Sequence, residues 1–337
     1  MVIRPGPVRF TLPGPEGVTT LFIAADATEL IGKTPMLQLN RVFPDSPARI
    51  LAKFEAANPT SIKDRGMLSI IRKAMAEGRV RDGTEVVEAT SGNSGIAIAS
   101  LAAIMGFRAR LYMSEACSVE RQKLMCAYGA TVVLTPAAEH TKGARDRALA
   151  YCAANPETTF FANQHSNPDN GLSHCKTTGP EIWEQTGGDI GAVVIGLGTC
   201  GTFEGLSRYF RNADPSIRIV GVEPSASPVF SGGLQGQHKI NGIGPGMITE
   251  NFRRGADRLD EILLVEDDVA FEWSRLVTRR EGIIVGPTSG ATIWGAGELA
   301  RRPEFSGKTI VCFIYDTGER YLSVPELFSL DGVEQAD

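Results

Sequence analysis

The stretch TSGNSG at residues 90–95 lies between an apolar run at 84–88 and a run rich in small residues at 95–105. This order predicts a buried strand, a tight turn and a helix. Backbone N–H groups at the start of such a helix favour a bound carboxylate or phosphate. Upstream, the stretch NPTSIKDR at residues 58–65 carries Lys63, whose amine can attack a carbonyl carbon. The chain therefore combines an anion-binding turn with a nucleophilic amine.

Short apolar runs alternate with amphipathic stretches along the rest of the chain. The expected strands are 50–54, 84–88, 108–113, 131–134, 192–195, 217–222 and 310–314. The expected helices are 64–77, 95–105, 119–128 and about 203–210. Strands and helices that alternate at this spacing indicate β-α units on mostly parallel sheets. We therefore expect two α/β domains with a ligand cleft between them.

Two segments interrupt the alternation. Four prolines within the first fifteen residues disfavour helix, so residues 1–26 are expected to form an extended N-terminal arm. Residues 224–245 form a long glycine-rich connection, and long connections in compact domains are often functional.

Composition excludes several classes of function. The chain has 337 residues, with 34 basic and 39 acidic side chains and a net charge of −5. It has no cluster of Lys and Arg, so nucleic-acid binding is not expected. It has no apolar run long enough for a membrane span and no signal-peptide pattern. Its six cysteines and four histidines show neither disulfide nor metal-ligand spacing, so we expect a cytoplasmic protein without a bound metal.

The stretch GLGTCG at residues 196–201 allows two interpretations. It is a G-x-G-x-x-G sequence after a predicted strand, and Glu223 ends the next strand, as in dinucleotide-binding folds. The same turn, with hydroxyls on Thr199 and Thr202, equally suits a single phosphate monoester. Lys63 and the 90–94 turn favour the second interpretation, because amino-acid chemistry on pyridoxal phosphate requires both and a nicotinamide enzyme requires neither.

Further short motifs follow in a fixed order between residues 31 and 323. They are IGKTP 31–35, SVER 118–121, AYGA 127–130, NQ 163–164, TTGPEIW 177–183, SGG 231–233, HKINGIG 238–244, EGI 281–283 and DTGERYLS 316–323. The ordered set resembles the fold-type II pyridoxal-phosphate enzymes, specifically the cysteine synthase (O-acetylserine sulfhydrylase) and cystathionine β-synthase family. The resemblance implies a tryptophan-synthase-β-like α/β fold of two three-layer αβα domains, with twisted, mostly parallel sheets and the active site in the cleft between them. It places a smaller domain at 45–164 and a larger one at 27–44 with 165–325.

The resemblance also implies roles for individual residues. Lys63 would form the internal aldimine with pyridoxal 5'-phosphate and then act as base and acid at Cα. Asn93 would bond the ring hydroxyl of the cofactor, and Thr288 would face the pyridine nitrogen. The cofactor phosphate would be held by Gly198, Thr199, Cys200, Gly201 and Thr202. The amino-acid substrate would be held by Thr90, Ser91, Asn93, Ser94, Gln164 and Gly242.

The implied reaction is β-substitution on an activated L-serine. A hydroxyl at Thr288 leaves the pyridine nitrogen essentially neutral, which favours expulsion of a β-leaving group and an α-aminoacrylate intermediate. O-Acetyl-L-serine with sulfide, giving L-cysteine, is the expected pair. An amine nucleophile, as in 2,3-diaminopropionate synthases, and homocysteine remain alternatives. O-Phospho-L-serine is a further alternative, although residues 225–247 offer no arginine to its leaving group. An NAD-binding oxidoreductase is the remote alternative.

Two departures from the family pattern and two partners complete the expectations. Cys200 lies in the phosphate loop, and its thiol is either inert or redox-sensitive. His165 follows Gln164, as a packing residue or as a hydrogen-bond partner of a polar second substrate. The resemblance implies a homodimer, which the N-terminal arm would clasp, and serine acetyltransferase is a further partner that it allows.

Overall fold

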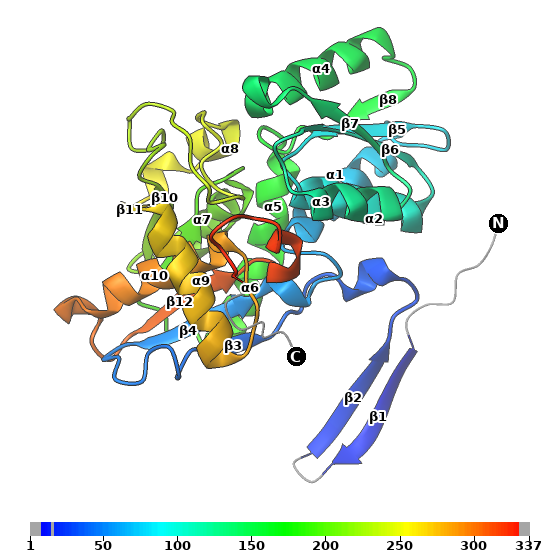
Figure 1. The fold of residues 1–337 in the computed structure, drawn as a ribbon. Helices are drawn as coiled ribbons and strands as arrows, with labels where there is room; N and C mark the ends of the chain where they lie inside the picture. Colours follow the sequence, from blue (N-terminus) through cyan, green and yellow to red (C-terminus); the bar gives the residue numbers. More distant parts are fainter. Residues whose placement is uncertain (1–7, 15–16, 330–337) are drawn as a thin grey trace, which may run out of the picture.

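The computed structural model describes residues 8–14 and 17–329, and in this part of the chain two separate sheets carry the helices (Figure 1). The larger sheet has the strand order β11-β10-β9-β12-β4-β3. Its strands are β3 (Met36–Gln38), β4 (Arg49–Phe54), β9 (Ala192–Gly196), β10 (Arg218–Pro224), β11 (Glu261–Val265) and β12 (Thr309–Ile314). All neighbours in it are parallel except β3, which pairs antiparallel with β4.

The smaller sheet is entirely parallel and has the strand order β7-β6-β5-β8. Its strands are β5 (Glu85–Ala89), β6 (Arg108–Ser114), β7 (Thr131–Thr135) and β8 (Thr159–Phe161). Strand β5 is buried along its whole length, as expected for a central parallel strand covered on both faces.

Helices cover both faces of each sheet, which gives the three-layer αβα arrangement expected from the resemblance. The helices are α1 (Lys63–Ala76), α2 (Asn93–Met105), α3 (Val119–Ala127), α4 (His140–Ala154), α5 (Pro168–Lys176), α6 (Thr178–Thr186), α7 (Gly201–Ala213), α8 (Glu250–Arg253), α9 (Asp267–Glu281) and α10 (Pro287–Ala300). Strand β12 shows the layering: Ile310, Cys312 and Ile314 pack toward α10, whereas Val311 and Phe313 pack toward α7. Its continuous apolar run therefore serves two cores.

The expected strands and helices are present, with shifts of a residue or two at most ends. Two expectations need correction. The arm before residue 26 contains an antiparallel hairpin, β1 (Val8–Gly14) with β2 (Gly17–Ile23), rather than a simple extended segment. Strand β4 pairs with β12 in the larger sheet, although the expected boundary placed it in the 45–164 domain. Strand β3 lies before residue 45, in the segment expected to belong to the larger domain, and it pairs with β4 in the same sheet.

Four helix N-termini meet where the two sheets face each other. Helix α1 begins at Lys63, α2 at Asn93, α7 at Gly201 and α10 at Pro287, and residues at or next to these starts line one cavity. For α2 and α7 this convergence follows from the β-α connections, because each starts at the carboxyl end of the strand before it, whereas α1 follows β4 through residues 55–62 and α10 follows α9. Among the described helices, none combines the length and apolar character that a bilayer span needs.

Candidate active site

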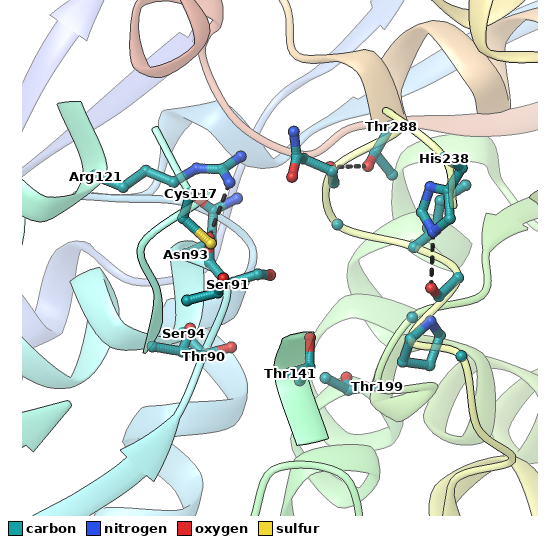
Figure 2. A pocket seen from close by; sticks show the side chains of 18 of the residues that line it. Thr90, Ser91, Asn93, Ser94, Cys117, Arg121, Thr141, Thr199, His238 and Thr288 are labelled. Atoms are coloured by element: carbon teal, nitrogen blue, oxygen red, sulfur yellow. Dashed lines mark hydrogen bonds between the residues drawn. The ribbon is translucent and has the colours of Figure 1, made fainter. Parts of the chain in front are cut away.

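A cavity of about 950 Å³ lies between the two sheets. Figure 2 shows Thr90, Ser91, Asn93 and Ser94 grouped on one wall, with Thr288 and His238 across the space from them. All of the expected site residues except Gly201 line this cavity, and Gly201 begins the helix below it. The structure therefore brings together the segments that the sequence placed far apart.

Lys63 is the first residue of α1, and its amine lies in a desolvated position. Burial lowers the pKa of Lys63, which Asp316 and Cys200 offset only in part. A lowered pKa increases the fraction of the neutral amine, which is the form that attacks a carbonyl and that accepts a proton. The turn before it is fixed by Asp64, whose carboxylate accepts hydrogen bonds from the hydroxyl and the backbone N–H of Thr60.

A buried ion network holds α1 against the larger sheet. The Arg65 guanidinium donates to Glu55 at 2.7 and 2.8 Å and to Glu181 at 2.8 and 2.7 Å. The Lys53 ammonium lies 2.8 Å from Glu181. Burial alone would raise the pKa of Glu181, but hydrogen bonds and charges from Arg65 and Lys53 lower it to about 2. The network therefore fixes the side chain of Arg65, two positions after Lys63.

The 90–94 turn is built around the hydroxyl of Thr90. This oxygen accepts hydrogen bonds from the N–H groups of Gly92 at 2.9 Å and Gly95 at 3.2 Å. Gly92 has a φ of 155°, and the Arg121 side chain packs where its Cβ would lie, so only glycine fits there. Arg121 also donates to the carbonyl of Ser91 at 2.9 Å. Arg121 belongs to the SVER motif at 118–121, but the sequence does not indicate its contact with Ser91.

Gln164 connects this turn to the phosphate loop at 198–202. Its side-chain oxygen accepts from the Ser94 hydroxyl, and its side-chain N–H donates to the carbonyl of Ala89 at 3.1 Å. Its own carbonyl accepts from Asn170 and Asn251, both at 2.8 Å. These two asparagines were not predicted as site residues, because they lie singly in stretches without a recognisable pattern.

The phosphate loop ends at Cys200, which has a φ of 61° and precedes the first turn of α7. Close contacts require its glycines: a Cβ on Gly198 would meet the carbonyl of Gly242, and one on Gly201 would meet Asn170. The first N–H groups of a helix have no partner within it and are available to a phosphate. The Thr202 hydroxyl lies 3.3 Å from Nε2 of His174. Burial lowers the pKa of His174, so that ring is neutral.

Cys200 fits the inert interpretation of its thiol. Burial raises the pKa of Cys200 well above its usual range. Its Sγ lies 3.4 Å from the carbonyl oxygen of Gly198. The thiolate is the reactive form of cysteine, and this environment suppresses it.

Glu223 does not support the dinucleotide interpretation. Its carboxylate is fully buried and accepts hydrogen bonds from the N–H groups of Phe230 at 2.9 Å and Ser231 at 2.8 Å. The Ser231 hydroxyl also donates to it, at 2.5 Å. Glu223 therefore folds the start of the glycine-rich connection and has no free oxygen face for a ribose.

Thr288 is the second residue of α10 and lies across the cavity from the 90–94 turn (Figure 2). Its hydroxyl donates to the carbonyl of Asn241 at 2.8 Å, and a Cβ on Gly242 would lie 2.6 Å from that hydroxyl oxygen. Gly242 has a φ of 119°, which favours glycine. The glycine-rich connection thus packs directly on the start of α10 and on Gly198.

These features fit pyridoxal phosphate. A glycine-lined helix start with the Thr199 and Thr202 hydroxyls suits a phosphate, and the Lys63 amine in the same cavity, with its pKa lowered by burial, suits an aldehyde. The neutral hydroxyl of Thr288 is placed on the opposite wall. The donor set therefore matches the three polar parts of the cofactor.

Glu88 supports the site from behind, at the end of β5. Its carboxylate accepts from the N–H groups of Ala89 and Gln164, both at 2.9 Å. Burial raises the pKa of Glu88 to about 7, although these hydrogen bonds and Arg145 act in the opposite direction. A buried glutamate inside an apolar strand is a signal that the sequence contained, but its role needed the structure.

Glu88 should make the stability of the protein depend on pH. The folded state holds this proton more tightly than the unfolded state, so stability falls as pH rises from about 4.5 to 7. We expect the free energy of unfolding of wild type, relative to Glu88→Gln, to fall by about 1–3 kcal/mol between pH 4.5 and 8. Denaturant titrations at both pH values measure this difference. Glu157→Gln, at an exposed position, is the control and should show no such change. A difference that is flat with pH would contradict the raised pKa.

Comparison with known proteins agrees with the geometry. Residues 27–316 match the family model described as pyridoxal-phosphate dependent enzyme. The chain is 42% identical over 307 residues to a cysteine synthase of Staphylococcus aureus strain Mu50, covering 90% of this chain and 97% of that protein.

Two solved structures are similar over almost the whole chain. The cysteine synthase of Entamoeba histolytica superposes with a TM-score of 0.86 and 37% identity, covering 94% of this chain and 93% of the other. An O-ureido-L-serine synthase superposes with a TM-score of 0.87 and 35% identity, covering 94% and 98%. Both the sequence match and the shared architecture show that this chain belongs to the pyridoxal-phosphate dependent enzyme family.

Proposed function

We propose that this protein is a cysteine synthase, which replaces the acetoxy group of O-acetyl-L-serine with sulfide to give L-cysteine. One observation carries the proposal: the amine of Lys63, the 198–202 loop and the 90–94 turn open into the same cavity. The similar cysteine synthases of Staphylococcus aureus and Entamoeba histolytica support the choice of reaction.

The residues of the cavity divide the work. Pyridoxal phosphate, held through Lys63 and by Gly198, Thr199, Cys200, Gly201 and Thr202, supplies an electron sink for charge that develops at the substrate Cα. The 90–94 turn and Gln164 bind the substrate carboxylate through hydroxyl, amide and backbone donors at the start of α2, where the helix dipole favours an anion. Gly242 leaves room for the substrate beside Thr288.

Lys63 moves the proton. With its pKa lowered by burial, the amine nitrogen takes the proton from Cα and returns it to Cα after the nucleophile has added at Cβ. Thr288 offers a neutral hydroxyl rather than a carboxylate at the start of α10, so loss of the β-substituent is favoured over a long-lived carbanion. Closure of the 90–94 turn over the carboxylate would exclude water from the reacting carbons.

Replacement of the lysine tests the cofactor link. Purified wild type should show a visible absorbance band at about 410–430 nm, and Lys63→Ala should lose it because the amine proposed to form the imine is removed. Lys239→Ala, which removes another lysine from the same cavity, is the matched control and should retain the band. A wild-type protein without the band, or borohydride reduction that still attaches the cofactor covalently to the Lys63→Ala chain, would contradict the proposal.

A second candidate keeps the same first substrate and uses an amine nucleophile. His165 lines the cavity, is 8% exposed, and its Nδ1 has no hydrogen-bond partner within the described residues. Burial lowers the pKa of His165 to about 3, so the ring is neutral and able to bond a polar nucleophile. The similarity to an O-ureido-L-serine synthase is compatible with a nucleophile larger than sulfide. Homocysteine and an O-phospho-L-serine donor are weaker alternatives.

Product formation separates these candidates. O-Acetyl-L-serine, and separately O-phospho-L-serine, should be offered with sulfide, homocysteine or an amino-acid amine, and the products identified by mass spectrometry. We expect O-acetyl-L-serine with sulfide to be at least about tenfold better in kcat/KM than any other pair, with ping-pong kinetics. In His165→Phe the sulfide reaction should be retained. Turnover with an amine alone, abolished in His165→Phe, would instead establish the second candidate.

We propose that the chain forms a homodimer through its N-terminal hairpin. In Figure 1 the hairpin β1–β2 stands away from the rest of the chain. A lone two-stranded hairpin is marginally stable in water, so a second surface would stabilise it. Deletion of residues 1–25 should convert a dimer to a monomer in sedimentation velocity. An unchanged dimer would contradict this role of the arm.

We further propose that the enzyme works in the cytoplasm. Its six cysteines are free thiols, and Cys200 and Cys312 are buried, which suits a reducing compartment. Serine acetyltransferase, which makes the proposed acyl substrate, is the partner enzyme that fits this reaction.

A further inference from the structure

The side chain of Asn93 is held from two sides by residues near the end of the chain. Its Nδ2 donates to Oδ2 of Asp316 at 2.6 Å, and its Oδ1 accepts from Nη1 of Arg320 at 2.8 Å. In Figure 2 Asn93 lies on the wall that carries Ser91 and Ser94. The two partners thus come from a segment more than two hundred positions away in sequence, just beyond β12.

The chemistry of the partners fixes the orientation of this amide. A carboxylate only accepts hydrogen bonds and a guanidinium only donates them. A flipped amide would face its NH₂ toward Arg320 and its oxygen toward Asp316, and both contacts would be repulsive. One N–H of Asn93 is therefore committed to Asp316, and within the described residues the other has no second acceptor. Asn93 offers this N–H to a ligand.

Both partners are themselves immobilised. Asp316 is 1% exposed, and its Oδ2 also accepts from the Tyr321 hydroxyl at 2.5 Å. Arg320 donates from Nη2 to the carbonyl of Thr60 at 2.7 Å, in the turn that leads to Lys63. The two partners have opposite formal charges, and the charge of Asp316 also acts on Lys63.

The same segment also reaches α3. The Ser118 hydroxyl donates to the carbonyl of Arg320 at 3.1 Å. Glu120 accepts from the N–H and the hydroxyl of Ser323, at 2.8 and 2.6 Å. Residues 316–323 therefore connect the turn before Lys63, the start of α2 and the start of α3.

We propose that Asp316 and Arg320 are positioning residues that hold the Asn93 amide as a hydrogen-bond donor to the oxygen substituent on the cofactor ring. The inference rests on the proposed function for the identity of that ring. It assigns no proton transfer to either residue. Among the described residues that line the cavity are Asn93 and Asp316 but not Arg320, so Arg320 acts on the ring through Asn93, and a double-mutant cycle isolates the part of the Asp316 effect that passes through Asn93.

The experiment compares holoenzymes by absorbance and by cofactor retention, without substrate. Asp316→Asn replaces the carboxylate by a group that can both donate and accept, so the Asn93 amide is no longer fixed. We expect a shifted visible absorbance maximum and about tenfold faster loss of cofactor on dialysis, the effect of about one hydrogen bond. Arg320→Lys keeps the charge but not the two-point contact, and it should show the same shift. It takes the place of Asp316→Asn if that variant proves unstable.

A double-mutant cycle separates positioning from a direct or merely structural role. In an Asn93→Ala background, Asp316→Asn should add less than about twofold to cofactor loss, since its route of action has been removed. Glu120→Ala, which cuts the same segment from α3 but does not touch Asn93, is the control and should keep the wild-type absorbance maximum.

Several results would overturn the inference. Asp316→Asn and Arg320→Lys holoenzymes with wild-type absorbance and cofactor retention would do so, as would full additivity with Asn93→Ala. A wild-type protein without a visible band would contradict the proposed function instead. The two failures are therefore distinguishable.

Discussion

A buried arginine fixes the geometry on which the cavity depends. Arg65 lies on α1, which packs on the smaller sheet, but its guanidinium bonds Glu55 and Glu181 from the larger part of the fold. Leaving one charge of such a buried network unpaired costs about 3–5 kcal/mol, so the helix has one stable position. Because Lys63 begins the same helix, the position of its amine relative to the 198–202 loop follows from this network.

The cavity attracts anions through helix dipoles as well as through the charges of Arg121 and Lys239, which also line it. Burial lowers the pKa of His165 and raises that of Cys200, so both are neutral in the protein, and it lowers the pKa of Lys63, which favours the neutral amine. The starts of α2, α7 and α10 then supply the positive ends of helix dipoles. A site of this kind binds phosphate and carboxylate while its amine stays available as a nucleophile.

Regular patterns in the sequence were sufficient for the layers and for the main site, but single polar residues were not recognisable. Apolar runs predicted the central strands, and the 90–95 and 196–201 stretches predicted the anion-binding turns. The assignment of β4 failed because its pairing with β12 joins residues about 260 positions apart, which no local pattern encodes. Glu88 and Asp316 form hydrogen bonds with residues 76 and 223 positions away, so composition around them carries no signal of their partners. Asn170 bonds Gln164 only six positions away, but it lies singly in a stretch without a recognisable pattern. Glu223 is the reverse case, because its spacing from the 196–201 stretch matches a dinucleotide site. In the structure its carboxylate instead accepts hydrogen bonds from the backbone of the glycine-rich connection.

Gln164 stands between the two ligand-binding segments of the cavity. Its side chain bonds Ser94, and its carbonyl bonds Asn251, which also donates to the carbonyl of Thr199 at 2.9 Å. Any displacement of Gln164 at one end must therefore strain the contacts at the other. Thermodynamic reciprocity then relates the two affinities. If a bound amino acid changes the affinity of the cavity for the phosphate by some factor, the bound phosphate must change the affinity for the amino acid by the same factor and in the same direction.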